Sequence, residues 1–284
     1  MAGLQTGPGC YRSGDLQVGA CLPMWFQLTC SQMKKLLTSA LLLCAFSLSA
    51  QAPTPVPLAH GDVPGEPHHH VKIENEYVRV YYVEVPPHEN TQLHQHDHDY
   101  LFVTLGDSDV INAVRDKPEV HLVLKDGETH FTRGGFAHVA RNLADTPFRN
   151  VTIELMKPQE KPRNLCANVV LDSPVTGVCG APRPNAPNFR TALFETDGIL
   201  AEYDWLGPDA DVLRVKKKAD RLLVVFDQSR LRAEMAGVAP MELRGGDSLW
   251  LPAESDPAFE NLLEAASSRF LLISFKTIEP AKKP

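Results

Sequence analysis

Short runs of hydrophobic residues, many of them alternating with polar ones, dominate the chain from residue 71 onward. Gly, Pro, Asn and Asp separate these runs, and no long helical period appears. Alternation over four to eight residues between such breakers is typical of β-strands. The pattern predicts strands over Val78–Val85, Tyr100–Leu105, Val110–Val114, Val120–Lys125, Ala137–Leu143 and Phe148–Leu155.

A second series of the same kind follows a Pro-rich stretch over residues 159–189, which we interpret as a linker. Short strands at this spacing favour a β-sandwich or barrel. We therefore expect an all-β chain with one barrel over 71–158 and another over 190–280. The predicted strands of the second series are Thr191–Glu195, Ile199–Trp205, Leu222–Phe226, Leu231–Met235, Asp247–Leu251 and Phe270–Phe275.

The start of the chain has a different character. Residues 33–52 combine Lys34 and Lys35, a short apolar run and an Ala-rich end, which is the pattern of a secretory signal peptide. The apolar run is shorter than the ~20 residues that a spanning helix needs. We expect residues 1–32 to be a mis-assigned upstream extension. Residues 53–70 are rich in Pro and contain His68-His69-His70, and we expect them to be a flexible lead-in rather than a metal site.

Charge and cysteine content narrow the function classes. The net charge of the chain is −7. Without residues 1–52, which we call the leader, Arg12, Lys34, Lys35 and Asp15 are absent and the net charge is about −9. An acidic domain is a poor binder of nucleic acid or of anionic membranes. Four of the six cysteines lie in the leader, which leaves Cys166 and Cys179 in an exported, periplasmic or extracellular protein. Because such compartments allow oxidation, we predict a disulfide between these two cysteines.

One polar stretch carries candidate chemistry. His94, His96 and His98 alternate, so in a regular strand their imidazoles face the same side, and Asp97 and Asp99 face the other. Neutral imidazoles suit Zn, Cu, Fe and Ni. A solvated histidine cluster is an equally good interpretation of this spacing taken alone.

A second stretch, Gly127 to Asn142, favours the metal-site interpretation of the histidine stretch. The two together resemble the cupin motifs G-x5-H-x-H-x3/4-E-x6-G and G-x5-P-x-G-x2-H-x3-N. Arg133 takes the place of the motif's proline, and His88 takes the place of its opening glycine. The matching positions are His94, His96, Gly106, Gly127, Gly135, His138 and Asn142.

The resemblance implies a metal held by His94, His96 and His138, with Fe, Mn, Ni, Cu and Zn all compatible. The family's acidic ligand has no clear counterpart here: counting from the histidines places it at Tyr100 or Leu101, and counting back from Gly106 places it at Asp99. Asp99 is our tentative fourth ligand. His98, Asp99 and Tyr100 are the candidates for a catalytic base beside the metal.

Other polar residues of this region have simpler interpretations. His121 and His130 match no family position, so we expect them at the surface or in the barrel wall. Arg133 could face a carboxylate substrate, although an exposed loop arginine is the simpler interpretation.

The second strand series carries the same spacing without the ligands. Gly246 to Asn261 repeats the second motif with Pro257 at the histidine position, and Leu213 and Val215 stand at the two histidine positions of the first motif. The resemblance thus implies two cupin-like jelly-roll barrels in tandem, the second one metal-free.

Two function classes follow. The first is a metal-dependent enzyme acting on a small molecule, of the dioxygenase, isomerase or lyase type. The second is a binding or sensing protein for a sugar or organic acid, without turnover. We expect a small-molecule ligand, no nucleic-acid partner and no stable membrane insertion once the signal peptide is cleaved, and a homodimer is compatible with this organisation. One barrel hosts many chemistries, so fold alone does not separate the two classes.

Overall fold

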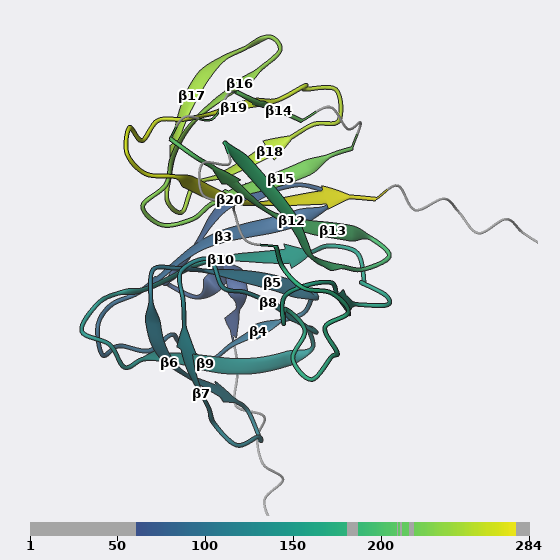
Figure 1. Cartoon of the computed structure of the whole chain (residues 1–284). Coiled ribbons are helices and arrows are strands. Elements are labelled where there is room, and N and C mark those ends of the chain that lie inside the picture. The colour runs from purple at the N-terminus through teal and green to yellow at the C-terminus, as the bar shows by residue number, and fades with distance from the viewer. Residues whose placement is uncertain (1–60, 181–186, 209, 211, 216–218, 277–284) are drawn as a thin grey trace, which may run out of the picture. The chain divides into compact units, whose positions relative to one another are not determined.

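The structure is a computed structural model that describes residues 61–180, 187–208, 210, 212–215 and 219–276. Two sandwiches of β-strands follow each other along the chain, the first drawn in blue and teal and the second in green and yellow in Figure 1. This confirms the prediction of an all-β chain. The predicted signal peptide, the upstream extension and residues 53–60 lie outside the described residues.

The first barrel is built from two five-stranded sheets, with the orders β1-β4-β9-β6-β7 and β2-β3-β10-β5-β8. All pairings are antiparallel except β1 with β4. The strands are β1 (Gly61–Asp62), β2 (His69–Glu74), β3 (Val78–Val85), β4 (His94–His96), β5 (Tyr100–Leu105), β6 (Ser108–Val114), β7 (Val120–Leu124), β8 (Thr129–Thr132), β9 (Phe136–Asn142) and β10 (Phe148–Leu155); a 3-10 turn, η1 (Val63–Gly65), follows β1.

The second barrel is built from a six-stranded sheet, β11-β12-β13-β20-β15-β18, and a four-stranded sheet, β14-β19-β16-β17. Apart from β11, each strand stands where one of β2–β10 stands in the first barrel, so the strand order repeats. The strands are β11 (Arg163–Asn164), β12 (Asn188–Glu195), β13 (Ile199–Leu206), β14 (Leu213–Arg214), β15 (Arg221–Val225), β16 (Arg230–Met235), β17 (Val238–Arg244), β18 (Ser248–Leu251), β19 (Ala258–Asn261) and β20 (Ser268–Phe275).

The register of the repeat differs by two residues from the sequence expectation. His94 pairs with His138 between β4 and β9. In the second barrel the residue bonded to Pro257 is Val215, whose amide donates to the Pro257 carbonyl at 3.0 Å, while Leu213 pairs with Phe259. Val215 is therefore the counterpart of His94, and the counterpart of His96 falls among residues outside the described set.

Residues 61–70 belong to the first barrel, so the expectation of a flexible lead-in was wrong for them. β1 pairs with β4, and Val63 and Glu66 are buried. Val63 packs with Tyr81 and Phe148 in the inner hydrophobic cluster of this barrel. Because residues 61–70 are rich in Pro, their sequence did not indicate that they close the barrel beside the histidines.

A shared hydrophobic core joins the barrels. The sheet of β3, β10 and β5 and the sheet of β13, β20 and β15 contribute their outer faces to one buried cluster, which includes Val103, Ile153, Val224 and Ile273. Strands buried on both faces carry nearly continuous hydrophobic runs, as in the fully buried β15. Ion pairs of Arg149 with Asp227 and of Arg269 with Asp126 flank this core.

Two glycines explain how closely the barrels approach. Gly127 and Gly246 both have positive φ, 78° and 88°, which favours glycine. A Cβ at Gly127 would lie 2.6 Å from the Phe226 ring, and one at Gly246 would lie 3.0 Å from Tyr82. Each motif glycine thus serves a tight turn and a contact with the other barrel.

The linker contains a disulfide between Cys166 and Cys179, which are 13 residues apart. Asn164 organises the enclosed loop, since its side-chain oxygen accepts hydrogen bonds from the amides of Val169 and Val170. Val169 is buried and its carbonyl accepts from the amide of Phe131 on β8. The linker therefore packs on the first barrel.

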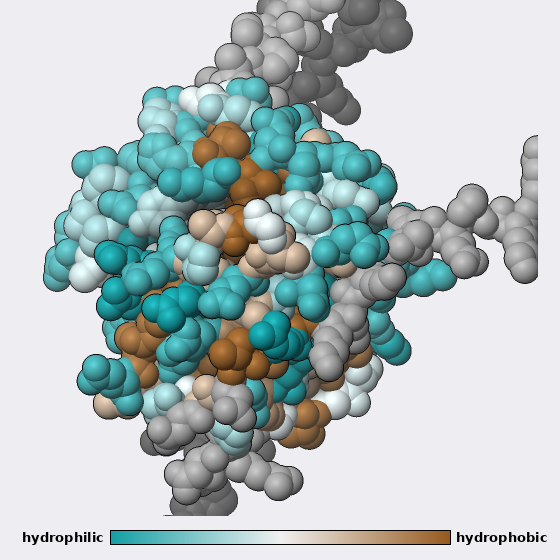
Figure 2. Space-filling view, turned by 90° about the horizontal axis from the view of Figure 1, so that it is seen from above, coloured by the Kyte–Doolittle hydropathy of each residue, from teal (hydrophilic) through white to brown (hydrophobic). Residues whose placement is uncertain are grey.

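Polar side chains dominate the face in Figure 2, and hydrophobic ones form separate patches between them. Within the part of the chain that is described, no helix is long and apolar enough to cross a bilayer.

Candidate metal centre

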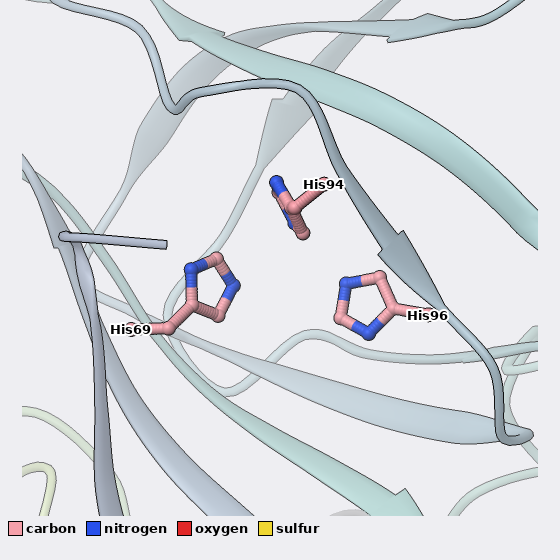
Figure 3. A group of neighbouring side chains, drawn as sticks. All are labelled: His69, His94 and His96. Carbon is pink, nitrogen blue, oxygen red and sulfur yellow. The ribbon is translucent and has the colours of Figure 1, made fainter. Parts of the chain in front are cut away.

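Four imidazoles converge inside the first barrel. His94 and His96 project from β4 and His69 projects from β2 toward the same space (Figure 3), and the nearest ring nitrogens of these three all lie within 4.8 Å of one another. His138 on β9 lies beside this group, with its Nε2 3.1 Å from Nε2 of His94 and its ring centroid 5.3 Å from that of His96. Two nitrogens bound to one ion at about 2.0–2.2 Å are separated by about 3.0–3.4 Å.

Each ring is oriented by a hydrogen-bond partner behind it, at Nδ1. Nδ1 of His69 lies 2.5 Å from a Glu66 carboxylate oxygen, and Nδ1 of His94 lies 2.8 Å from the Gln92 carbonyl. Because all four partners are acceptors, each Nδ1 carries a proton, and in the neutral ring Nε2 then keeps its lone pair. The other two contacts join His96 to Glu154 at 3.3 Å and His138 to the Asn112 side-chain oxygen at 2.7 Å.

Burial keeps the imidazoles of His94, His96 and His138 neutral. It lowers the pKa of His94 to about 4. Burial, together with the neighbouring histidines, also lowers the pKa of His96 and of His138 well below the ordinary value. A neutral imidazole is the form that binds a metal, because the protonated ring has no free lone pair.

Two buried carboxylates stand behind the rings and offset the charge of a divalent ion. Burial alone would raise the pKa of Glu66, but hydrogen bonds from His69 and from the Gln92 and His68 amides lower it to about 2. Burial raises the pKa of Glu154, which accepts a hydrogen bond from the Tyr81 hydroxyl at 3.2 Å. The donor set therefore fits a divalent transition metal.

The arrangement identifies the fold. A histidine pair on β4 faces a third histidine on β9, inside a two-sheet barrel, four residues before an asparagine. Asn142 donates from its side chain to the carbonyls of Val85, Pro86 and Thr146, which pins the loops at this end of the barrel. The chain has the cupin fold, in two copies.

Solved structures similar to this chain include cupin proteins. AerE from Microcystis aeruginosa aligns with a TM-score of 0.48 at 12% identity, over 75% of this chain and 99% of its own. A salicylate 1,2-dioxygenase variant from Pseudoaminobacter salicylatoxidans, in complex with gentisate, aligns with a TM-score of 0.48 at 12% identity, over 70% and 69%. A cupin domain from Bordetella pertussis aligns with a TM-score of 0.30 at 26% identity, over 34% and 97%.

Sequence comparison adds nothing to this. The chain matches no protein-family model, and no curated protein is significantly similar to it.

Asp99, the tentative fourth ligand, is not brought to the cupin site. Its carboxylate accepts hydrogen bonds from Arg133 at 2.8 Å and from the amides of Gln159 and Gly134 at 3.0 and 3.2 Å. These contacts fix the β8–β9 loop and the start of the linker against the turn before β5. Arg133 is consequently paired with Asp99 and does not face the cavity.

His69, and not Asp99, is the fourth side chain beside the three motif histidines. This residue lies in the His68-His69-His70 run that we had assigned to the lead-in. The signal available in the sequence was Glu66, because a carboxylate three residues before a histidine can bind its Nδ1. Strand alternation also lets only the middle histidine of the run face inward, and His69 is 8% exposed.

The two remaining candidates lie differently. Tyr100 is buried, and its ring stacks on His96 with centroids 4.2 Å apart. Burial raises its pKa, so the hydroxyl stays protonated. His98 is half-buried in the turn before β5 and is not among the residues that line the cavity.

A cavity of about 160 Å³ opens from the histidines into the barrel interior. Its walls are mainly apolar, with Phe102, Val110 and Leu124 among them. His130, expected in the barrel wall, does line this cavity and stacks on Phe102 with centroids 4.9 Å apart. His121 is exposed and pairs with Asp109, as a surface residue should.

Proposed function

We propose that this chain is an exported, metal-dependent enzyme that converts a small organic molecule, with dioxygenase-type chemistry favoured over isomerase or lyase chemistry. The observation that carries the proposal is the set of four imidazoles, each held at Nδ1, beside a cavity of substrate size. A closed structural site would leave no room for a ligand, whereas a catalytic metal needs an open position. When bound, the metal would act as a Lewis acid or as a centre for oxygen chemistry.

The residues around the centre offer few groups for proton transfer, and His130 is the candidate among them. None of the described residues that line the cavity is Asp, Glu, Lys or Arg. Tyr100 is held protonated by burial, and His130 is bonded to Glu128 at 2.9 Å. Because isomerases and lyases usually need a positioned base, this lining favours a reaction carried by the metal.

Export is supported by two independent features. The sequence of residues 33–52 has the pattern of a signal peptide, and a disulfide persists in oxidising compartments such as the periplasm or the extracellular space.

Metal analysis of the purified full chain tests the metal centre. We expect about one transition-metal ion per chain in the wild type and its loss in His96→Ala. The matched control is His121→Ala, which removes an exposed imidazole of the same barrel and should leave the metal content unchanged. Equal loss in both variants, or metal retained in His96→Ala, would refute the assignment.

A binding protein without turnover is the alternative, and the absence of Asp, Glu, Lys and Arg from the described cavity lining is compatible with it. Oxygen consumption separates the two. Iron(II)-loaded wild type should consume oxygen with at least one of a panel of small phenols and enols, and His96→Ala should not. Tight binding of a panel member without consumption would favour the binding function.

A further inference from the structure

The cavity next to the histidines carries information about the substrate, given the proposed metal centre. Cavities of about 150 Å³ lined by Leu, Ile and Phe hold a benzene molecule. The cavity here has a similar volume, about 160 Å³. Its occupant is therefore about the size of one aromatic ring.

The walls are mainly apolar from the histidines to the mouth. Val110 and Leu124 are 2% exposed, and with Phe102, Leu122 and Phe148 they form much of the lining. At the opening stand Val120 and Leu171, which line the cavity and are 48% and 57% exposed. A ligand thus passes apolar surface on entry and buries its own apolar surface inside.

Away from the proposed metal, no Lys or Arg of the described residues lines the cavity to receive a carboxylate. The nearby arginines are engaged elsewhere: Arg133 with Asp99, Arg141 with Glu119 and Arg149 with Asp227. An unpaired carboxylate buried in such an environment loses much more solvation than a neutral group does.

Apart from the histidines, the polar groups that line the cavity are hydroxyls and amides. Asn150 accepts a hydrogen bond from the Thr152 hydroxyl at 2.8 Å and lies on β10, facing the cavity. Asn112 accepts from His138. Such amides orient hydroxyl or carbonyl groups without demanding a charge.

We infer that the substrate is an uncharged molecule of about one aromatic ring, which presents hydroxyl or carbonyl oxygen atoms to the metal and apolar surface to the barrel. The lining disfavours rings of the same shape that carry a carboxylate on the side away from the metal. The inference rests on the proposed metal centre and goes beyond it, because it specifies the charge and size of the ligand.

Cobalt(II)-loaded full-length protein provides a readout other than activity, because its visible absorption changes when a ligand reaches the metal. The probes are catechol, 3,4-dihydroxybenzamide and 3,4-dihydroxybenzoate. The last two have the same shape and the same chelating oxygens and differ in the charge of the group that enters the cavity. We expect catechol and the amide to bind, and the acid to bind at least tenfold more weakly than the amide.

Ala140→Phe tests the location of the ligand. Ala140 lines the cavity, and its counterpart in the second barrel is Phe259, so the variant fills the space as the second barrel does. It should keep its cobalt and lose catechol affinity by at least tenfold. Val123→Phe, which adds an aromatic ring at a position that is 64% exposed, should bind catechol as the wild type does.

The failures are distinguishable. Stoichiometric cobalt with acid and amide bound equally, with no probe bound, or with unchanged catechol affinity in Ala140→Phe would overturn the substrate inference and leave the metal centre standing. Failure to bind cobalt at the histidines would overturn the metal centre itself.

Discussion

The first barrel places Asn112, Ala140 and Asn150 around its interior, where the second barrel has Ala233, Phe259 and Phe270 at the matching register positions. The rings of Phe259 and Phe270 lie 5.5 Å apart and both are fully buried. The same strand order therefore encloses a cavity in one case and a packed hydrophobic core in the other. Small and polar inner residues keep the first barrel open.

The two barrels also show which motif residues serve the fold. Asn142 and Asn261 each donate to three or more loop carbonyls, and Gly127 and Gly246 make the same positive-φ turn. His94 and His138, by contrast, are replaced by Val215 and Pro257. Structural motif positions persist in the barrel that has lost its donors, so a motif match alone does not indicate chemistry.

The largest expected effect comes from opening the packed barrel. Phe259→Ala should lower the free energy of unfolding by about 3–5 kcal/mol, because it leaves a cavity among buried side chains. Phe102→Ala in the first barrel should cost less, because that ring already borders open space. Denaturant unfolding measures both. An equal cost would contradict the contrast between a packed and an open interior.

Removal of the disulfide should have the next largest effect. Cys166→Ser with Cys179→Ser frees the loop that carries Leu171 to the cavity mouth, and the loss expected from loop entropy is about 3 kcal/mol. Thermal unfolding with and without reductant checks this. Reductant should shift the wild type but leave the double variant unchanged.

A buried carboxyl group in the second barrel, that of Asp204, predicts that stability depends on pH. Asp204 pairs with Arg190 at 2.7 Å, at the register position that Val83 and His69 occupy in the first barrel. Burial raises the pKa of Asp204 to about 6, above the unfolded value of about 3.9. Its contribution to stability is therefore full below about pH 4 and is lost as the pH rises through about 6.

The two pKa values differ by about two units, which corresponds to about 3 kcal/mol. Asp204→Asn should accordingly flatten the dependence of unfolding free energy on pH between about 4 and 6. Asp247→Asn, at an exposed turn of the same barrel, serves as the control. Identical pH profiles for wild type and Asp204→Asn would exclude this role.

The smallest predicted effect concerns the carboxylate behind His69. Glu66→Gln keeps a hydrogen-bond acceptor but removes the charge, and should weaken metal binding by about 10–100-fold. Competition with a chromogenic chelator measures the affinity. Glu128→Gln, which alters the partner of the cavity-wall residue His130, should leave metal affinity unchanged.

Much of the fold could be predicted from the sequence. Strands such as Val78–Val85 and Phe148–Leu155 follow from alternation and breakers alone, and β3 and β10 have those bounds. The tandem cupin architecture follows from the motif spacing. β17 was missed because Val238–Arg244 has polar and exposed residues and contains Pro240, so no alternating face marks it.

The errors at the site have a common physical origin. The importance of His69 depends on its approach to His94, 25 residues away, where the ring centroids are 4.6 Å apart. Asp99 was assigned by spacing although its carboxylate is used by Arg133 and two amides. His88, at the motif's glycine position, adopts φ 59° without being glycine. Local spacing does not show which side chains the barrel closure turns inward.

The central claim is that one metal ion is bound by the imidazoles of the first barrel. Anomalous diffraction from crystals of the metal-loaded full chain tests it most directly. We predict a single strong peak within about 2.0–2.2 Å of Nε2 of His69, His94, His96 and His138, and none in the second barrel. A peak bound elsewhere, or one that leaves His69 outside the coordination sphere, would contradict the account.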